Sequence, residues 1–469
     1  MNDLTPFDAS SNRHPSTDRL ASLLASLGDI PVVTDPTIVR RRSRDFFWYS
    51  PVLNDQLNDK SADLIVAPRD EADIVRVVAA CVRHRVPLTV RAGGTGNYGQ
   101  AVPLAGGVLL DVTALDTIEW IRPGQIRVGA GAKMNAIDAA TRPSGYELRM
   151  HPSTKRTATI GGFVAGGSGG VGSITYGGLR EPGNILAARI VTMEPEPRII
   201  ELRDDAAQKI NRAYGTTGII TALEMPLAPA WPWIDVVVVF DDFLAAVEFG
   251  QAAALSDGIV KKLLSPITWP LPAYFGALKS CCPEGKSILI AMIAEHSLKH
   301  FKNLLGDRGT ITLEMPTDDE GSGKVPLYEY TWNHTTLQVL KNDRSVTYLQ
   351  CLYPHDRLLQ KVDEMRTMFP DEVLQHLEFI RFNGQLTCSG LPVVRYSDAE
   401  RLNEIIRLHE AHEVHIANPH VYTVEDGSRY KRVDVDQLGF KHEVDPYGLL
   451  NPGKMRSFVA ERDGPMSTD

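Results

Sequence analysis

Glycine and hydroxyl side chains gather in two stretches of the chain that are suited to holding the phosphates of a nucleotide. The first, VRAGGTGNYG, contains a G-x-G-x-x-G pattern at Gly94, Gly96 and Gly99 and follows an apolar run at residues 86–90. The second, HPSTKRTATIGGFVAGGSGGVGSITYGG, covers residues 151–178. Glycine-rich backbone exposes its amide groups and can form a concave nest for an anion. Two such stretches predict loops on opposite sides of one extended nucleotide.

The pattern at Gly99 is not followed by the helix that a nicotinamide-dinucleotide motif requires. In that motif the helix begins at the third glycine and its N-terminus faces the pyrophosphate. Here the next residues are QAVPLAGGVLLDV, which include Pro103, Gly106 and Gly107. In a helix interior, glycine costs about 1 kcal/mol and proline about 3 kcal/mol. We therefore expect a loop and then a strand, with a purely structural turn as the alternative for this loop alone.

The segment before the first glycine loop predicts a β-α-β unit. An apolar run at residues 62–67 precedes a stretch whose apolar residues recur at helical spacing: Ile74, Val77, Val78, Cys81 and Val82. Asp70 is the expected N-cap of this helix, with Asp73 three residues further on. Pro87 ends the helix, and residues 88–90 form the next strand.

The chain beyond the glycine stretches predicts a second domain. Short apolar runs and glycine turns continue to about residue 180, and PLAPAWPW at residues 226–233 is typical of a linker. It is followed by the strand-like WIDVVVVF, the helical DDFLAAVEFGQAAAL, and strand-like segments near 288–293 and 345–352. This alternation indicates an α+β domain.

Four blocks, in this order along the chain, carry a family resemblance. They are VPLTVRAGGTGNYG, HPSTKRTATIGGFVAGGSGG, YGTTGIITALEMPL and VDPYGLLNPGKM. With them the chain resembles FAD-linked oxidases of the vanillyl-alcohol oxidase and p-cresol methylhydroxylase type, which include glycolate oxidase and D-2-hydroxyacid dehydrogenase flavoproteins. The resemblance implies an α+β fold with a two-subdomain FAD-binding domain and an α+β substrate, or cap, domain. The expected division is an N-terminal segment at 1–54, the FAD-binding domain at 55–228, the cap domain at 229–440 and a tail at 441–469 that returns to the FAD-binding domain.

The resemblance also implies which residues contact FAD. The first loop would wrap the pyrophosphate with Ala92, Gly93, Gly94, Thr95, Gly96, Asn97 and Tyr98. The family's P-S-S element and its turn toward the ribityl chain and isoalloxazine ring are matched by Pro152, Ser153, Thr154, Ala158, Thr159, Gly161, Gly162 and Phe163. Ile220 would meet the adenine side through its backbone, and Asn451 and Lys454 lie in the returning tail. A lysine near the flavin would favour the anionic reduced form, which is our hypothesis for Lys454.

The residues used for covalent flavin attachment in this family are absent. A histidine often follows the two glycines of the first loop, but Thr95 follows Gly93 and Gly94 here. The second common site, a cysteine ahead of the glycine cluster, is occupied by HPSTK. We therefore expect FAD to be bound non-covalently.

Candidates for the chemistry over the flavin come from the second domain. Oxidation of an alcohol sends the C–H hydrogen as hydride to flavin N5, while a base takes the O–H proton. His420 and Tyr422 are candidates because alternate residues of the strand expected there would share a face. His334 in YEYTWNHTTL and Arg381 in LEFIRFNGQL are the others, and an arginine facing a pocket binds a carboxylate through two hydrogen bonds. Structural roles for all four remain the alternative.

Four histidines in HEAHEVHIANPH suggest a metal site by their number alone: His409, His412, His415 and His420. The zinc-dependent D-2-hydroxyacid dehydrogenases have an H-G-H-x-G-D-G-N-x-H block, which this chain lacks. The first two of the four histidines are expected on an amphipathic helix, and the others do not match a compact ligand spacing. We therefore expect no metal.

Composition excludes several classes of function. A formal net charge of −9 argues against nucleic-acid binding, which needs a basic surface. The sequence has no apolar run long enough for a transmembrane helix, and the polar N-terminus lacks the apolar region of a signal peptide. Five cysteines without a C-x-x-C pair favour reduced thiols and a cytoplasmic location.

The sequence thus favours an FAD-dependent oxidoreductase that oxidises a small alcohol, first of all a 2-hydroxy acid. A phenolic or benzylic alcohol oxidase is the competing enzymatic hypothesis. An FAD-bearing electron-transfer subunit that acts with partner chains is the third. The electron acceptor, whether oxygen or a partner redox protein, and the oligomeric state stay open.

Overall fold

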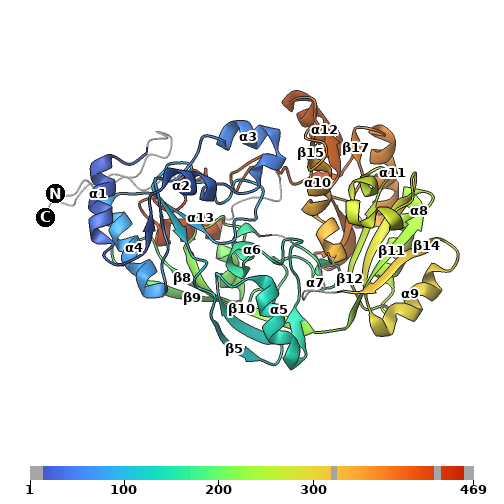
Figure 1. Cartoon of the computed structure of the whole chain (residues 1–469), viewed down its shortest axis with the longest axis horizontal. Coiled ribbons are helices and arrows are strands. Elements are labelled where there is room, and N and C mark those ends of the chain that lie inside the picture. Colours follow the sequence, from blue (N-terminus) through green and yellow to red (C-terminus); the bar gives the residue numbers. More distant parts are fainter. Residues whose placement is uncertain (1–13, 168, 318–324, 427–434, 459–469) are drawn as a thin grey trace.

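The chain folds into two lobes, which lie on the left and the right of Figure 1. The structure, a computed structural model, describes residues 14–167, 169–317, 325–426 and 435–458. Parts of the predicted N-terminal segment, cap domain and tail (residues 1–13, 318–324, 427–434 and 459–469) therefore lie outside the described residues. No helix among the described residues is long and apolar enough to cross a membrane.

A four-stranded sheet of the first lobe, in the order β1-β2-β4-β3, contains the predicted β-α-β unit. Its strands are β1 (Val32–Val33), β2 (Leu64–Val66), β3 (Leu88–Arg91) and β4 (Val108–Asp111). Both β2 and β3 pair with β4 in parallel, and α4 (Glu71–His84) connects them. Asp70 caps α4 by accepting a 2.8 Å hydrogen bond from the Asp73 amide, as predicted. Residues 92–107 then form a loop without a helix, which confirms the prediction for the stretch after Gly99.

An antiparallel sheet in the order β5-β6-β10-β8-β9 forms the other half of this lobe, and β7 also pairs with β10. Its strands are β5 (Ile118–Arg122), β6 (Gln125–Gly129), β7 (Tyr146–Leu148), β8 (Ala187–Val191), β9 (Ile199–Arg203) and β10 (Ile219–Pro229). The accompanying helices are α5 (Met134–Thr141), α6 (Ile160–Gly166) and α7 (Ser173–Tyr176). Leu227 and Ala228 pair with β7, so β10 continues through part of the linker predicted at 226–233. That pairing is a tertiary contact, which local sequence does not reveal.

The second lobe is built on an antiparallel sheet in the order β12-β13-β11-β14. Its strands are β11 (Trp233–Phe240), β12 (Lys261–Ile267), β13 (Ser287–Ala294) and β14 (Thr310–Pro316), with helices α8 (Phe243–Leu255) and α9 (Leu298–Leu305). The predicted strand WIDVVVVF and the helix after it are thereby confirmed.

Two smaller sheets, in the orders β15-β20-β17 and β18-β19-β16-β21, complete the second lobe. Their strands are β15 (Val346–Tyr348), β16 (Cys351–Leu352), β17 (Val373–Leu374), β18 (Leu377–Phe382), β19 (Gln385–Gly390), β20 (Val393–Arg395) and β21 (His415–Ile416). The helices are α10 (Asn333–Leu340), α11 (Leu358–Met368) and α12 (Ala399–Ala411).

The strand predicted to carry His420 and Tyr422 is not formed, and that prediction was wrong. β21 ends at Ile416, and a turn follows. The Asn418 side chain accepts a 2.9 Å hydrogen bond from the His420 amide, which folds the backbone back on itself. This local bond takes the amide that a strand would have paired with a neighbour.

The N-terminal helices belong to the first lobe. They are α1 (Thr17–Ser26), α2 (Pro36–Arg42) and α3 (Pro51–Leu57). Leu23 and Leu27 share a buried cluster with apolar residues of α4 such as Ile74 and Val78. α1 therefore packs beside α4 (Figure 1), while Val39 of α2 packs against Ile65 and Leu109 of the sheet.

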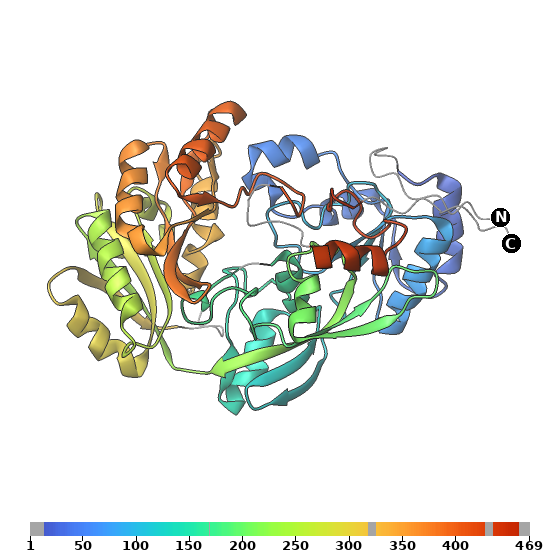
Figure 2. The same cartoon turned by 180° about the vertical axis from the view of Figure 1, so that it is seen from behind.

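The C-terminal segment returns to the first lobe, where the red helix α13 (Val435–Val444) lies in Figures 1 and 2. Phe440 and Val444 pack into the core of the antiparallel sheet. The Leu88 amide donates to Leu449 O at 2.9 Å, and the Asn451 amide donates to Leu88 O at 2.7 Å. Contact with the first lobe therefore begins before residue 441, and the domain boundaries at 54, 228 and 440 stay predictions.

Candidate functional site

The two glycine-rich stretches lie against each other in the first lobe. A Cβ at Gly93 would lie 2.6 Å from Thr157 O, so the two backbones approach more closely than any side chain allows. Across the same contact, the Thr154 hydroxyl donates to Thr95 Oγ1 at 3.5 Å. Thr159 then caps α6, and its hydroxyl accepts a 3.3 Å hydrogen bond from the Gly162 amide.

A narrow cavity of about 120 Å³ lies between these stretches. Nine of the predicted cofactor residues line it: Ala92, Gly93, Gly94, Thr95, Gly96, Thr159, Gly161, Gly162 and Ile220. Asp45 and Arg91 also line it. The loops predicted to face one ligand thus enclose one space.

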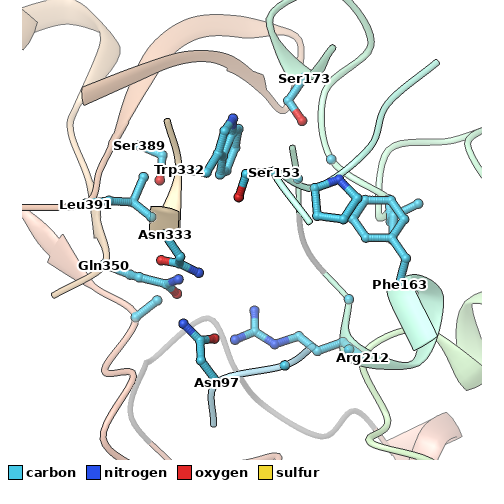
Figure 3. Close-up of a pocket in the computed structure, with 18 of the residues that line it drawn as sticks. Asn97, Ser153, Phe163, Ser173, Arg212, Trp332, Asn333, Gln350, Ser389 and Leu391 are labelled. Atoms are coloured by element: carbon cyan, nitrogen blue, oxygen red, sulfur yellow. The ribbon is translucent and has the colours of Figure 1, made fainter. Parts of the chain in front are cut away.

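A larger cavity of about 650 Å³ opens between the two lobes (Figure 3). Predicted cofactor residues on its wall are Thr95, Gly96, Asn97, Tyr98, Pro152, Ser153, Thr154, Ala158, Gly162 and Phe163. The second lobe contributes Trp332, Asn333, Gln350, Ser389 and Leu391, among others. Thr95, Gly96, Gln100, Gly162 and Gly166 line both cavities, so the two spaces meet at the glycine loops.

Known proteins resemble this chain in its first lobe. A family profile described as an FAD binding domain matches residues 62–202. That match covers β2 to β9 and both glycine-rich stretches. Residues 62–202 therefore belong to an FAD-binding domain.

Three curated relatives match over parts of the chain. They are the glycolate oxidase subunit GlcD of Escherichia coli (29% identical over 207 residues, 42% of this chain and 41% of the relative), D-lactate dehydrogenase of Archaeoglobus fulgidus (30% over 118 residues, 25% and 26%) and D-2-hydroxyglutarate dehydrogenase of Pseudomonas putida (35% over 160 residues, 33% and 16%). The matched region is less than half of each relative's length. The predicted kinship with glycolate oxidase and D-2-hydroxyacid dehydrogenase flavoproteins is confirmed.

The overall fold is similar to that of a solved structure, alkyldihydroxyacetonephosphate synthase. The similarity has a TM-score of 0.69 at 15% sequence identity and covers 96% of this chain and 88% of that one. The similarity therefore extends through the second lobe. The predicted α+β architecture, an FAD-binding domain followed by a second α+β domain, is confirmed.

The residues around the narrow cavity fit an FAD diphosphate. A Cβ at Gly161 would lie 2.6 Å from Ala130 Cβ, so glycine is needed there for the backbones to pack beside the cavity. Arg91 lines the cavity, and its Nε is buried without a hydrogen-bond partner. A buried donor of this kind and open glycine amides are the groups that an anionic phosphate chain satisfies.

Asn451 connects the returning tail to three other segments of the FAD-binding domain. Its Nδ2 donates to Tyr214 O at 2.5 Å and to Gln100 O at 3.1 Å, and its Oδ1 accepts from the Thr89 hydroxyl at 3.3 Å. Asn451 adopts a left-handed backbone with φ of 45°, a conformation that asparagine tolerates better than most residues. Asn451 is not among the described residues that line the two cavities. It therefore supports the first glycine loop from the side away from the cavities.

Lys454 also holds the first loop from behind. Its buried Nζ donates to Gly99 O at 2.6 Å and lies 5.0 Å from the centre of the Tyr422 ring. Burial lowers the pKa of Lys454 to about 7 and raises that of Asp45 to about 6, and the opposite charge of each group partly offsets the other's shift. Lys454 is not among the described residues that line the cavities, and its effect on the flavin stays a prediction.

Two of the four catalytic candidates, His334 and Arg381, line the cavity between the lobes. Burial lowers the pKa of His334 to about 4, so its ring is neutral near pH 7. Arg381 lies on β18, and its Nη1 donates to Gly384 O at 3.4 Å.

His420 and Tyr422 are not among the described residues of that wall. The His420 ring is buried, with Nδ1 2.7 Å from Ser50 Oγ and Nε2 2.9 Å from Tyr348 O. Both ring nitrogens thus connect separate segments. Tyr422 packs in the small apolar cluster around Leu57 and lies against Lys454.

The other histidines of the HEAHEVHIANPH segment do not converge. His409 is buried on α12, where it stacks on Phe369 and bonds Ile405 O through Nδ1 at 2.8 Å. His412 pairs with Glu364, while His415 lines the large cavity. Within the described part of the chain, no group of three or more histidine, cysteine, aspartate or glutamate side chains could hold a metal ion.

Several residues on the wall of the large cavity were not singled out by the sequence: Arg212, Trp332, Asn333, Gln350, Ser389 and Leu391. Arg212 stands two residues before the YGTTG block, and Trp332 and Asn333 directly precede His334. Their nearness to a family block and to a catalytic candidate could have marked these positions in the sequence. Gln350 and Ser389 had no such signal, because only the sheet β18-β19-β16-β21 and its neighbours bring them to the cavity.

We expect Gly93→Ala to weaken FAD binding, because the added Cβ meets Thr157 O and separates the two loops. Overpacking costs about 1–3 kcal/mol, which corresponds to about 5- to 150-fold in affinity when the strain falls on the bound state. Flavin absorbance relative to protein after dialysis measures the loss. Gly258→Ala is the matched control, because a Cβ at Gly258 meets no atom within 4 Å. Unchanged flavin content in Gly93→Ala would show that binding does not need this approach.

We also expect acid precipitation to release the flavin into the supernatant. The hydroxyl of Thr95 stands where attachment would need a stronger nucleophile, and burial raises the pKa of the Cys351 thiol on the cavity wall, which keeps it protonated. Absorbance spectra of the pellet and the supernatant measure the outcome. A yellow pellet would contradict non-covalent binding.

Proposed function

We propose that the protein is an FAD-dependent oxidoreductase that oxidises a small alcohol, specifically a 2-hydroxy acid. The observation that carries the proposal is the junction of the two cavities at Thr95, Gly96 and Gly162. A dinucleotide held by the glycine loops extends from the narrow cavity into the larger one, which a second molecule enters from between the lobes. Cofactor and substrate then meet in a space walled by both lobes.

The names of the relatives support a 2-hydroxy acid as the substrate class. Glycolate, D-lactate and D-2-hydroxyglutarate, from which three of them take their names, all carry a hydroxyl beside a carboxylate. The likeness is confined to parts of each chain, so the substrate is taken as a class and not as one compound.

FAD, when bound, supplies the hydride acceptor at flavin N5. The chain must then remove the hydroxyl proton. His334 lines the large cavity, and burial keeps its imidazole in the neutral form that can accept a proton. The ring stands at the start of α10, beside Asn333 and Trp332, and α10 is fixed by the buried Thr335 and Thr336. We assign His334 the role of general base.

Two alternatives keep a specific observation in their favour. Aromatic side chains on the cavity wall, among them Phe46, Tyr49 and Trp332, suit a phenolic or benzylic alcohol. A relative whose name includes the word subunit favours an FAD-bearing component that passes electrons to a partner chain. The stopped-flow experiment described next also tests whether oxygen or a redox protein accepts the electrons from the reduced flavin.

Stopped-flow reduction of the isolated holoprotein under anaerobic conditions separates the three functions. We expect 2-hydroxy acids such as D-lactate or glycolate to bleach the flavin absorbance. Bleaching by aromatic alcohols alone would support the second function. Absence of bleaching by either class without a partner would support the third. Mixing the reduced protein with oxygen then measures whether oxygen is the acceptor.

We expect His334→Gln to slow flavin reduction by about 100-fold or more, because loss of a general base costs about 10²–10⁴-fold in rate. With a pKa near 4, the ring accepts a proton at higher pH and is protonated below it. The wild-type rate should therefore stay level as pH decreases and fall only as pH approaches about 4. His300→Gln, at an exposed residue of α9, is the control. An equal rate in His334→Gln would exclude the role.

A further inference from the structure

Arg212 is a positively charged residue on the wall of the large cavity that has no counter-ion among the described residues. It lines the wall, and its Nε is buried without a hydrogen-bond partner. No carboxylate of the described residues forms an ion pair with its guanidinium. Arg156, by contrast, lines the same cavity but is paired with Glu329 at 3.1 Å. A partly buried cation without a counter-ion is costly unless a ligand supplies the opposite charge.

The backbone holds Arg212 in place by a strained arrangement. Its φ is 54°, in the left-handed region that an arginine rarely adopts. Its amide donates to Val164 O at 3.0 Å, and Gly167 packs so closely that a Cβ there would lie 2.6 Å from Arg212 Cα. Strain of this kind costs about 1–3 kcal/mol and is concentrated at ligand sites. The loop before β10 therefore fixes the direction in which the guanidinium points.

Neutral polar groups surround the space in front of Arg212. Figure 3 shows its guanidinium directed toward Asn97, Asn333 and Gln350. Tyr98 lines the same wall; burial raises the pKa of its hydroxyl, and the polar side chains of Gln350 and Asn333 partly offset that rise. Amide and hydroxyl donors beside one arginine complement a planar anion with two oxygens, because the guanidinium fork binds a carboxylate through two parallel hydrogen bonds.

The opposite part of the cavity is apolar. Trp332 and Leu391 lie above the polar group in Figure 3, and Phe163 lies on the side of the FAD-binding domain. Trp332 is held with φ of 51° by its amide, which donates to the buried carboxylate of Glu378 at 2.7 Å. The cavity of about 650 Å³ must also hold the part of FAD that extends into it, so the size of the substrate is argued from this apolar wall and not from the whole volume.

We propose that Arg212, with Asn97, Asn333, Gln350 and Tyr98, binds the carboxylate of the substrate, and that the wall around Trp332 takes an apolar substituent. The substrate class is then a 2-hydroxy acid with an alkyl or aryl side chain of several carbons. The inference rests on the proposed function, since it names the substrate that the site would oxidise. It also assigns the carboxylate to Arg212 and not to Arg381, which lies in the β18-β19 hairpin.

The test is equilibrium binding of small probes to the holoprotein. Binding is measured from the change that each probe causes in the flavin absorbance, so no turnover is needed. Phenylacetate, phenylacetamide and acetate are the probes. We expect phenylacetate to bind at least about 10-fold more tightly than either of the others, because only it has both the charge and the ring. Truncating one partner of a desolvated charge pair weakens binding by about 30-fold or more, so Arg212→Met should lose phenylacetate affinity to that extent. Its affinity for phenylacetamide should change by less than about 3-fold, since a neutral ligand does not use the charge.

Three further variants sharpen the test. Arg212→Lys keeps the charge but not the fork, so we expect an intermediate affinity. Trp332→Leu should weaken the binding of phenylacetate and leave the affinity for acetate unchanged, because only phenylacetate has a ring that contacts Trp332. Arg41→Met, at an exposed residue of α2, should bind all three probes like the wild type. Flavin content is measured for each variant.

Four outcomes would overturn the inference. They are unchanged phenylacetate affinity in Arg212→Met, equal affinity of the wild type for phenylacetate and phenylacetamide, loss of FAD on replacing Arg212, and loss of phenylacetate binding only in Arg381→Met. Failure of the proposed function is a separate result. Probes that bind as expected while no hydroxy acid reduces the flavin would refute the reaction and retain the carboxylate site.

Discussion

Gly93 and Thr157 bring two backbones so close together that no side-chain carbon fits between them. The narrow cavity exists because the glycine stretches face each other across this contact, and the larger cavity begins where their ends diverge. Asn97 and Tyr98 continue the first stretch into the larger space, while Phe163 on α6 continues the second. A shift in the approach at Gly93 would therefore displace both the cofactor loops and the wall that a substrate contacts.

Polar contacts from distant segments hold the backbone of the first loop. Asn451 bonds backbone carbonyls at Gln100 and Tyr214, and Lys454 bonds the carbonyl of Gly99. Both residues come from the returning tail, whose strand-like contact with Leu88 places it beside the β3 strand. Backbone carbonyls that would otherwise be buried without partners are thus satisfied, and the loop keeps one conformation. The tail is a structural part of the FAD-binding domain, although the chain reaches it last.

The second lobe supplies what the FAD-binding domain lacks, namely a wall above the glycine loops. Trp332, Asn333 and His334 stand at the start of α10, and the Glu378 carboxylate on β18 fixes the Trp332 amide. Glu378 is itself buried with Ser265 and His376, so one polar group connects three segments of the lobe behind the cavity. Arg212 contributes to the wall from the first lobe. Its strained left-handed backbone is stabilised by contacts of its loop with α6. The second-lobe part of the wall therefore has its own supporting contacts, while Arg212 depends on α6 of the FAD-binding domain.

Much of the fold and of the cofactor site was predictable from sequence, because the interactions that decide them are local. Pro103 and two glycines exclude a helix after Gly99, Asp70 caps α4, and glycine is required wherever backbones meet without room for a Cβ. The cavity between the lobes was not predictable in the same way. More than a hundred residues separate Asn97 from Arg212, and more than a hundred separate Arg212 from Asn333 and Gln350. Only the packing of the two lobes brings these side chains together. A strand through His420 agreed with the alternating pattern, yet the Asn418 side chain turned the backbone and left His420 bonded to Ser50 and Tyr348. The sequence by itself determined the two glycine-lined loops that enclose the narrow cavity, since backbone conformation follows from neighbouring residues. The tertiary structure alone decided which side chains line the cavity between the lobes, since that depends on contacts between residues far apart in the chain.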